Sequence, residues 1–164
     1  MKTASIPLLA PLLAIAFAAG AQQLAPAQKP PATQQQLTPE QQAQVARQNV
    51  EMAKAALQVV QLVDQNRIAE VWEGASPVAK GIVTRENFVR QIGADRQQLG
   101  APANRKQVAI TRAAYAAGGE VPAGNYINVV YATKFANKPQ SVRELVSFHL
   151  DGDKTWRVSG YSLR

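Results

Sequence analysis

The amino-acid sequence predicts an α+β domain in which N-terminal helices pack on a curved, four-stranded antiparallel sheet in a roll-like arrangement. Between residues 38 and 99, apolar residues recur three or four positions apart, which is typical of amphipathic helices. Between residues 105 and 163, apolar and polar residues alternate in four stretches that are separated by short, turn-forming connections. Because successive strands with short connections pair antiparallel, residues 38–164 are expected to form one domain with a meander sheet.

The first helix is expected to begin at Thr38 and to end near Val63. Thr38 can cap the helix, Pro39 suits the first helical position, and Gln41 can complete a capping box. An apolar stripe along the helix is expected to be buried. The stripe consists of Ala46, Val50, Ala53, Leu57 and Val60, and it is widened by Val45, Met52, Ala56, Val59 and Val63.

Two further helices are expected before the sheet. A short helix covers residues 67–74, and Ser76-Pro77 is expected to end it, because the residue before a proline avoids helical geometry. Thr84 is expected to cap the next helix, which covers residues 85–99 and stops at Gly100.

Four strands are expected to follow, at residues 105–114, 125–135, 141–150 and 155–163. In the first strand, Val108 and Ile110 are expected to share a face. The second strand alternates most clearly, and one of its faces carries Ile127, Val129, Tyr131, Thr133 and Phe135. Asp151-Gly152-Asp153 is predicted to be a hairpin turn, because the further oxygen ligands that a calcium loop requires do not follow it.

Residues 1–21 have the three parts of a secretory signal peptide: a positively charged start, an apolar stretch and a small-residue cleavage site at Ala19-Gly20-Ala21. The apolar stretch is too short for a membrane-spanning helix, and it contains two prolines. Residues 22–37 are rich in Gln, Ala and Pro and are expected to form a disordered linker. The sequence therefore predicts a periplasmic or secreted protein whose mature form has no transmembrane segment.

Composition excludes several kinds of site. The chain has no Cys and one His, so thiol chemistry, Cys-bound zinc and His-rich metal clusters are excluded, and no metal or cofactor is expected. The formal net charge is +7, but the basic residues are scattered and no nucleic-acid recognition motif accompanies them. A solvated basic surface is favoured over contact with anionic lipid head groups or cell-wall polymers, and no nucleic-acid partner is expected.

Several local patterns between Val59 and Arg164 resemble one bacterial family. They are Leu62-Val63-Asp64 followed by Trp72, then Phe88 and Leu99-Gly100, then Tyr131-Ala132-Thr133-Lys134-Phe135-Ala136-Asn137-Lys138, an acid at Glu144, and a closing Trp156-Arg157-Val158-Ser159-Gly160-Tyr161. In this order they resemble the family called domain of unknown function 4019. The resemblance implies a small exported bacterial domain with no assigned activity. The order of elements is also similar to the nuclear-transport-factor-2-like superfamily of cone-shaped α+β rolls, a likeness of fold that does not give function.

Glu144 and His149 are the polar residues of most chemical interest on the third strand. Glu144 interrupts the apolar face of that strand. A carboxylate there is either a pocket base or part of a cross-strand ion pair with Arg112, Lys134 or Arg157, and the ion pair is favoured. His149 is expected to point away from the apolar face and to lie at the surface or at an edge.

The candidate pocket residues are Trp72, Tyr131, Phe135 and Glu144. The simplest interpretation of the three aromatic residues is that they pack in the hydrophobic core. The alternative is that they line an apolar pocket. No catalytic residue is assigned. The sequence thus favours an exported, non-enzymatic accessory or binding domain, whose unknown partner is either a small apolar ligand or an envelope protein on the open sheet face. The alternatives are a roll that binds a small apolar ligand and, less favoured, a hydro-lyase or isomerase with a pocket carboxylate.

Overall fold

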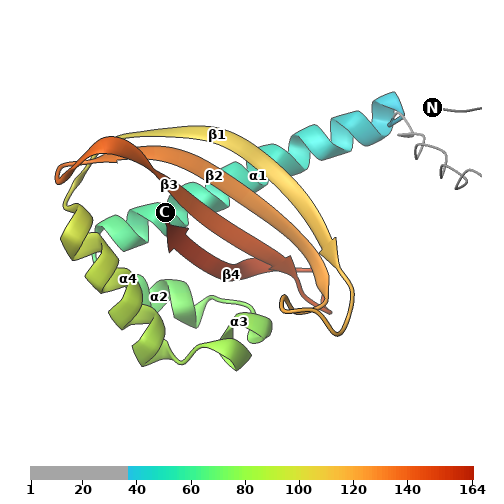
Figure 1. Ribbon diagram of the computed structural model, residues 1–164. Helices are drawn as coiled ribbons and strands as arrows, with labels where there is room; N and C mark the ends of the chain where they lie inside the picture. The colour runs from blue at the N-terminus through green and yellow to red at the C-terminus, as the bar shows by residue number, and fades with distance from the viewer. Residues whose placement is uncertain (1–36) are drawn as a thin grey trace, which may run out of the picture. The chain divides into compact units, whose positions relative to one another are not determined.

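In the computed structural model, which describes residues 37–164, four helices precede four strands (Figure 1). The elements are α1 (Pro39–Asp64), α2 (Ile68–Glu73), α3 (Pro77–Ile82), α4 (Arg85–Leu99), β1 (Pro102–Tyr115), β2 (Gly124–Phe135), β3 (Lys138–Leu150) and β4 (Trp156–Leu163). The sheet order is β1-β2-β3-β4 and every neighbouring pair is antiparallel, so the predicted α+β fold and meander are confirmed. The predicted signal peptide (1–21) and the predicted linker (22–37), apart from Leu37, lie outside the described residues.

The start of α1 follows from its local sequence. The Thr38 hydroxyl accepts a hydrogen bond from the Gln41 N–H at 3.3 Å, and the Gln41 side chain accepts one from the Thr38 N–H at 2.9 Å. These two bonds form the predicted capping box, and Pro39 occupies the first helical position. The helix ends at Asp64, close to Asn66, which adopts a positive φ of 59°.

The buried face of α1 differs from the predicted stripe. The buried residues are Met52, Ala56, Val59, Val60 and Val63, most of which belong to the widening set. Val50 and Leu57 are instead 56% and 45% exposed, so the prediction that they face the core was wrong. The reason is geometric, because the helix turns its other flank to the sheet and its N-terminal half extends beyond the strands (Figure 1).

Within residues 37–164, no helix is both long and apolar enough to cross a membrane.

The short helix α3 was not expected from the sequence. Ser76 was predicted to end the preceding helix, but α2 ends earlier, at Glu73, and Ser76 instead caps a new helix. The Ser76 hydroxyl accepts a hydrogen bond from the Val78 N–H at 3.2 Å, and Pro77 takes the first helical position. Ser-Pro therefore acts here as Thr38-Pro39 does in α1, as a helix start.

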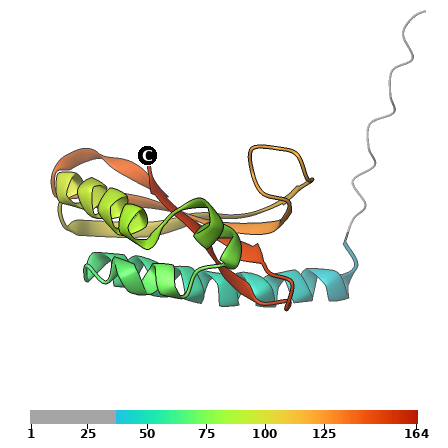
Figure 2. The same cartoon turned by 90° about the horizontal axis from the view of Figure 1, so that it is seen from below.

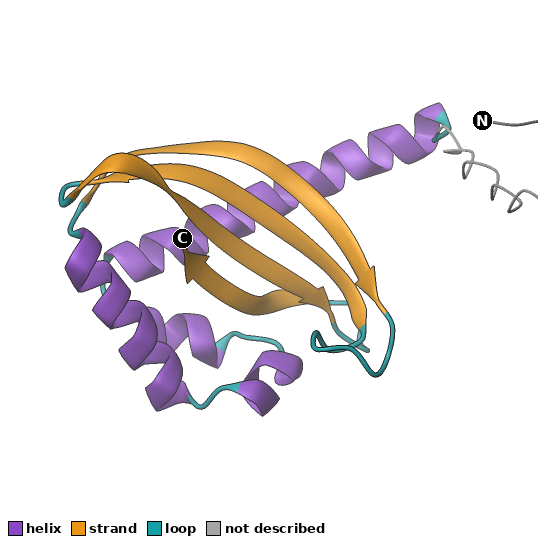
Figure 3. Cartoon of the chain, in the orientation of Figure 1, coloured by secondary structure: helices purple, strands orange, loops and turns teal. Residues whose placement is uncertain are grey.

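The helices lie against one face of the sheet. Figure 2 shows α1 running along one side of the strands, with no helix on the opposite side of the part of the chain that is described. Figure 3 shows how the shorter helices gather beside the β4 edge. Residues of α1, α2 and α4 pack with Ile127, Val129, Tyr131, Val146 and Phe148 in one hydrophobic core. We call the opposite side of the sheet the outer face.

A bulge in β1 changes which of its side chains face the core. The register passes from Gln107 opposite Tyr131 to Ala109 opposite Val130, so Val108 is an extra residue. Val108 is 54% exposed, whereas Ile110 packs against the core. The prediction that Val108 and Ile110 share a face was wrong because the inserted residue interrupts the alternation.

Candidate functional site

Glu144 lies at the centre of a buried polar network on the core side of the sheet. Its side chain is fully buried. One carboxylate oxygen accepts hydrogen bonds from Arg105 Nε and from the Thr133 hydroxyl, each at 2.6 Å. The other oxygen accepts from the Tyr161 hydroxyl at 2.6 Å and from Arg105 Nη2 at 3.2 Å. Both oxygens are therefore held by donors from the other three strands: Arg105 of β1, Thr133 of β2 and Tyr161 of β4.

Asp64, at the end of α1, joins the network through Arg105. The Asp64 oxygens accept from Arg105 Nη1 and Nη2 at 2.8 and 2.9 Å, and from Arg96 Nη2 at 3.0 Å. Burial alone would lower the pKa of Arg105, but its hydrogen bonds with Asp64 and Glu144 outweigh that effect and raise the pKa above its usual value. Arg105 thus holds two carboxylates from different layers of the fold.

The favoured interpretation of Glu144 as an ion-paired residue agrees with this geometry, but its partner is none of the three predicted. Lys134 and Arg157 project on the outer face, opposite to Glu144, as the register shows. Arg112 lies further along β1, opposite Ile127, and donates to Gln48 and Asn49 of α1. Arg105 reaches Glu144 across the intervening strand β2 because both side chains point inward.

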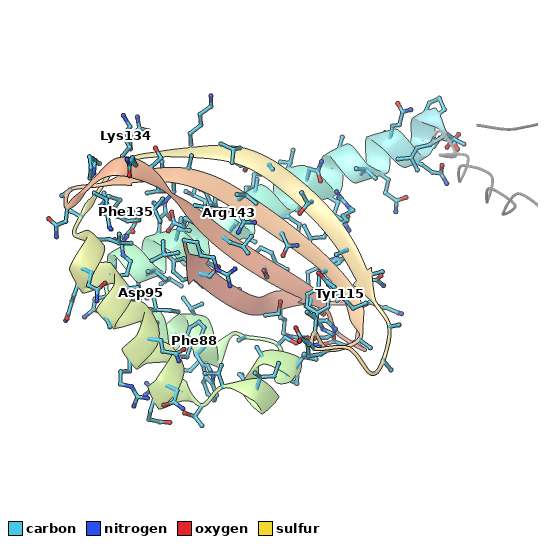
Figure 4. The ribbon with its side chains drawn as sticks, viewed as in Figure 1. Phe88, Asp95, Tyr115, Lys134, Phe135 and Arg143 are labelled. Atoms are coloured by element: carbon cyan, nitrogen blue, oxygen red, sulfur yellow. The ribbon has the colours of Figure 1, made fainter. Side chains whose placement is uncertain are left out.

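Arg96 is the incompletely paired member of the network. Its guanidinium lies over the ring of Phe135, 4.6 Å from the ring centroid. This stacking is a cation–π contact. Arg96 Nε and Nη1 are buried without a hydrogen-bond partner. Phe135 is therefore a core residue whose ring supports the network. Figure 4 shows its side chain directed toward the helices.

The structure separates the remaining candidate pocket residues. Tyr131 is buried in the core, its hydroxyl is 3.5 Å from the Ala53 carbonyl oxygen, and burial raises its pKa. Trp72 lies on α2, and its indole Nε1 donates to the Val83 carbonyl at 3.1 Å. Trp72 lines an open groove of about 190 Å³. Tyr131, Phe135 and Glu144 do not line this groove.

His149 points to the outer face, as predicted, but the prediction that it is exposed was wrong. Only 7% of the residue is accessible. Its Nδ1 is 2.7 Å from Asp151 Oδ1, and its ring packs edge-on against Tyr126 at a centroid distance of 5.0 Å. Gly124 lies directly against the ring, since a Cβ placed there would be 2.3 Å from His149 Nε2. The alternation of β3 gave the direction of the side chain, but the covering by neighbouring residues is a tertiary effect.

Asp151 links His149 to the start of α3. The Ser76 hydroxyl donates to Asp151 Oδ1 at 2.5 Å, and Arg157 Nη1 donates to Oδ2 at 2.9 Å. Serine and histidine thus bind the same carboxylate oxygen, whereas a hydrolytic triad needs the histidine between the serine and the acid. The predicted turn at residues 151–154 is present, with the Lys154 N–H donating to the Asp151 carbonyl at 2.9 Å. Within residues 37–164, no cluster of three or more His, Asp or Glu residues has a geometry suited to a metal ion.

The members of the Glu144 network are far apart in the sequence. Arg105 is 41 residues from Asp64 and 39 from Glu144. Part of the network could have been predicted from the sequence. Three consecutive strands each carry a polar residue on the inward face: Arg105, Thr133 and Glu144. Polar groups that share a buried face need one another as partners.

Comparison with known protein families identifies the chain. Residues 55–161 match the family described as "Protein of unknown function (DUF4019)". The chain belongs to this family. The matched region of this DUF4019 protein contains Glu144, Arg105, His149 and Asp151, so both polar clusters lie within the family domain. No curated protein matches the chain.

The hydrogen bonds that Ser76, His149 and Arg157 make to Asp151 predict that the domain loses stability as the pH falls into the acid range. Burial raises the pKa of Asp151, but hydrogen bonds from Ser76, His149 and Arg157 outweigh it and hold the pKa below its usual value. A carboxyl with a lowered pKa in the folded state stabilises the fold above its unfolded pKa of about 3.9, and this contribution is lost as the pH falls through the folded value. Asp151→Asn should therefore destabilise the domain at pH 7 in urea unfolding, and the difference from the parent should shrink below about pH 4. A difference that is the same at pH 7 and pH 3 would show that the Asp151 charge is not involved.

Proposed function

We propose that this DUF4019 protein is an exported accessory domain that works by binding a partner and not by catalysis. The observation that supports this proposal is the placement of its two candidate acid–base residues. Glu144 projects to the core side of β3 and His149 to the outer face. A hydro-lyase or isomerase needs an acid and a base that reach the same substrate, but these two side chains lie on opposite faces of the sheet.

The partners of each side chain also favour a structural role. Both oxygens of Glu144 are taken up by three neighbouring side chains. His149 is held by Asp151 and enclosed by Tyr126 and Gly124. Buried polar groups that are held in this way fix the packing of a fold. The outer face of the sheet is then the surface that remains for a partner.

Export is proposed from the sequence of residues 1–21, which has the composition of a signal peptide. Residues 22–37 would then join the mature N-terminus to the folded domain as a linker. The protein would act in the periplasm or outside the cell.

Both parts of this proposal can be tested on one preparation. The full chain is expressed in a bacterium, recovered from the periplasm or the medium, and analysed by intact mass. We expect a chain that begins at Gln22, after cleavage at Ala21. The same preparation should give no turnover in hydration, isomerisation and ester-hydrolysis assays. An uncleaved cytoplasmic chain would overturn the export proposal, and turnover that is lost in both His149→Gln and Glu144→Gln while the fold is retained would overturn the binding proposal.

The groove beside Trp72 favours a second candidate function, the binding of a small apolar ligand. Its walls include Phe88 and Tyr161, and the nearby Ser159 hydroxyl is buried without a hydrogen-bond partner. An apolar groove with one free polar group is a common form of small-ligand site. If the groove is a binding site, added indole should raise the melting temperature, measured by circular dichroism because indole interferes with tryptophan fluorescence. Ser159→Ala should make this increase smaller.

A further inference from the structure

The outer face of the sheet carries a row of basic side chains at one end: one from each of β1, β2 and β3, and one from Arg164, directly after β4. Lys106 of β1 lies opposite Ala132 of β2, and Ala132 lies opposite Arg143 of β3. The backbone of Arg143 pairs with that of Arg164 through two hydrogen bonds of 2.7 and 2.9 Å. Lys134 projects from β2 on the same face, two residues beyond Ala132. We call these four side chains (Lys106, Lys134, Arg143 and Arg164) the basic row.

The basic row is free of the ion pairs that occupy other basic residues. All four residues are exposed, and none takes part in a salt bridge within residues 37–164. Two other basic residues of the strands are in ion pairs: Arg105 with Asp64 and Glu144, and Arg157 with Asp151 and Asp153. Arg112 of β1 instead donates to the neutral side chains of Gln48 and Asn49, and Lys138 of β3 is exposed without a salt bridge in the described residues. Figure 4 shows Lys134 directed away from the helices and the adjacent Phe135 directed toward them.

Negative charge beside the outer face is confined to the end away from the basic row, where Asp151 and Asp153 pair with Arg157. Besides the basic row, the register places the following residues on this face: Asn104, Ala109, Thr111, Ala113, Tyr115, Tyr126, Asn128, Val130, Ala132, Leu145, Ser147, His149, Arg157, Gly160 and Ser162. None of these side chains is acidic. The residues between the cations are small and uncharged, so a flat partner can approach the row closely.

We propose that the basic row docks this protein on the anionic head groups of a lipid membrane. Neighbouring strands lie about 4.8 Å apart, so a row across four strands is roughly 15 Å wide, which is too wide for one small anion. A planar array of anions matches a row that lies on an open sheet face, and basic side chains bind such surfaces additively. The inference rests on the proposed function, because export would place the domain beside a membrane and binding would use its uncovered face.

Vesicle binding tests the proposal with the chain from Gln22 onward, which retains the whole described domain and its core. Co-sedimentation is measured with vesicles of phosphatidylcholine alone and with vesicles that contain 30% phosphatidylglycerol, at low salt. We expect binding only to the anionic vesicles. The triple variant Lys106→Gln/Lys134→Gln/Arg143→Gln should bind about 100-fold more weakly.

A second triple variant serves as the matched control. Arg47→Gln/Lys54→Gln/Arg90→Gln removes the same charge from exposed helix surfaces and should bind within about threefold of the parent. Equal losses in the two triple variants would overturn the proposal, because net charge alone would then explain binding. Binding to phosphatidylcholine alone, or row-dependent binding to double-stranded DNA without vesicle binding, would overturn it as well. Export is tested separately, by the intact mass of the mature chain. A failure of export can therefore be distinguished from a failure of vesicle binding.

Discussion

Arg105→Leu is expected to lower the free energy of unfolding by about 3–5 kcal/mol, the cost of removing one partner from a buried ion pair. Without the guanidinium, Asp64 keeps only its hydrogen bond from Arg96. Glu144, which is fully buried, keeps only the neutral hydroxyl donors of Thr133 and Tyr161. Because small domains are stable by about 5–15 kcal/mol, this loss is a large share of the total. Urea unfolding followed by tryptophan fluorescence measures it.

Arg96→Met is the matched control for this prediction, since it removes the same charge from the same network. Asp64 would keep its two hydrogen bonds from Arg105, and the two unpartnered nitrogens of Arg96 would be removed. We therefore expect a change within about 1.5 kcal/mol. If Arg96→Met destabilises the domain as much as Arg105→Leu, then Arg105 is not the residue that holds the two carboxylates.

Gly124→Ala is expected to destabilise the domain by about 2–5 kcal/mol, from a strained backbone and from overpacking. Gly124 has a φ of 143°, and its new Cβ would lie 2.3 Å from His149 Nε2. His149 cannot move easily because Asp151 and Tyr126 hold its ring. The melting temperature and urea midpoint should both fall.

Two comparisons separate the contributions at Gly124. Gly118 also has a positive φ, 90°, but nothing lies within 4 Å of a Cβ placed there, so Gly118→Ala should cost only about 1–3 kcal/mol of backbone strain. In a His149→Ala background, Gly124→Ala should cost less than in the parent, because the ring that it meets is gone. Equal costs in both backgrounds would show that contact with the ring is not the cause.

The order and type of the main elements could be predicted from the sequence because they depend on local chemistry. The capping box at Thr38, the cap at Thr84 and the alternation of β2 each report on neighbouring residues. The prediction failed where tertiary context decides between two local solutions. Ser76-Pro77 is compatible with both the end of one helix and the start of another, and its hydrogen bond to Asp151 belongs to a contact 75 residues away.

The candidate site could be predicted only in part for the same reason. Glu144 attracted attention because a carboxylate interrupted an apolar face, and an ion pair was the favoured explanation. Its partner could not be identified, since strand spacing and side-chain length together allow Arg105 to reach across β2. The direction of His149 followed from alternation, but its burial depends on Gly124, Tyr126 and Asp151, which come from other parts of the fold.

The bulge at Val108 has a consequence for how this protein behaves at high concentration. β1 is an edge strand, and its outward backbone groups are not paired within the sheet. A regular edge of that length would template the addition of strands from other molecules, which is the first step toward fibrils. The extra residue breaks the repeat of donors and acceptors midway along β1, so an incoming strand cannot stay in register along its whole length.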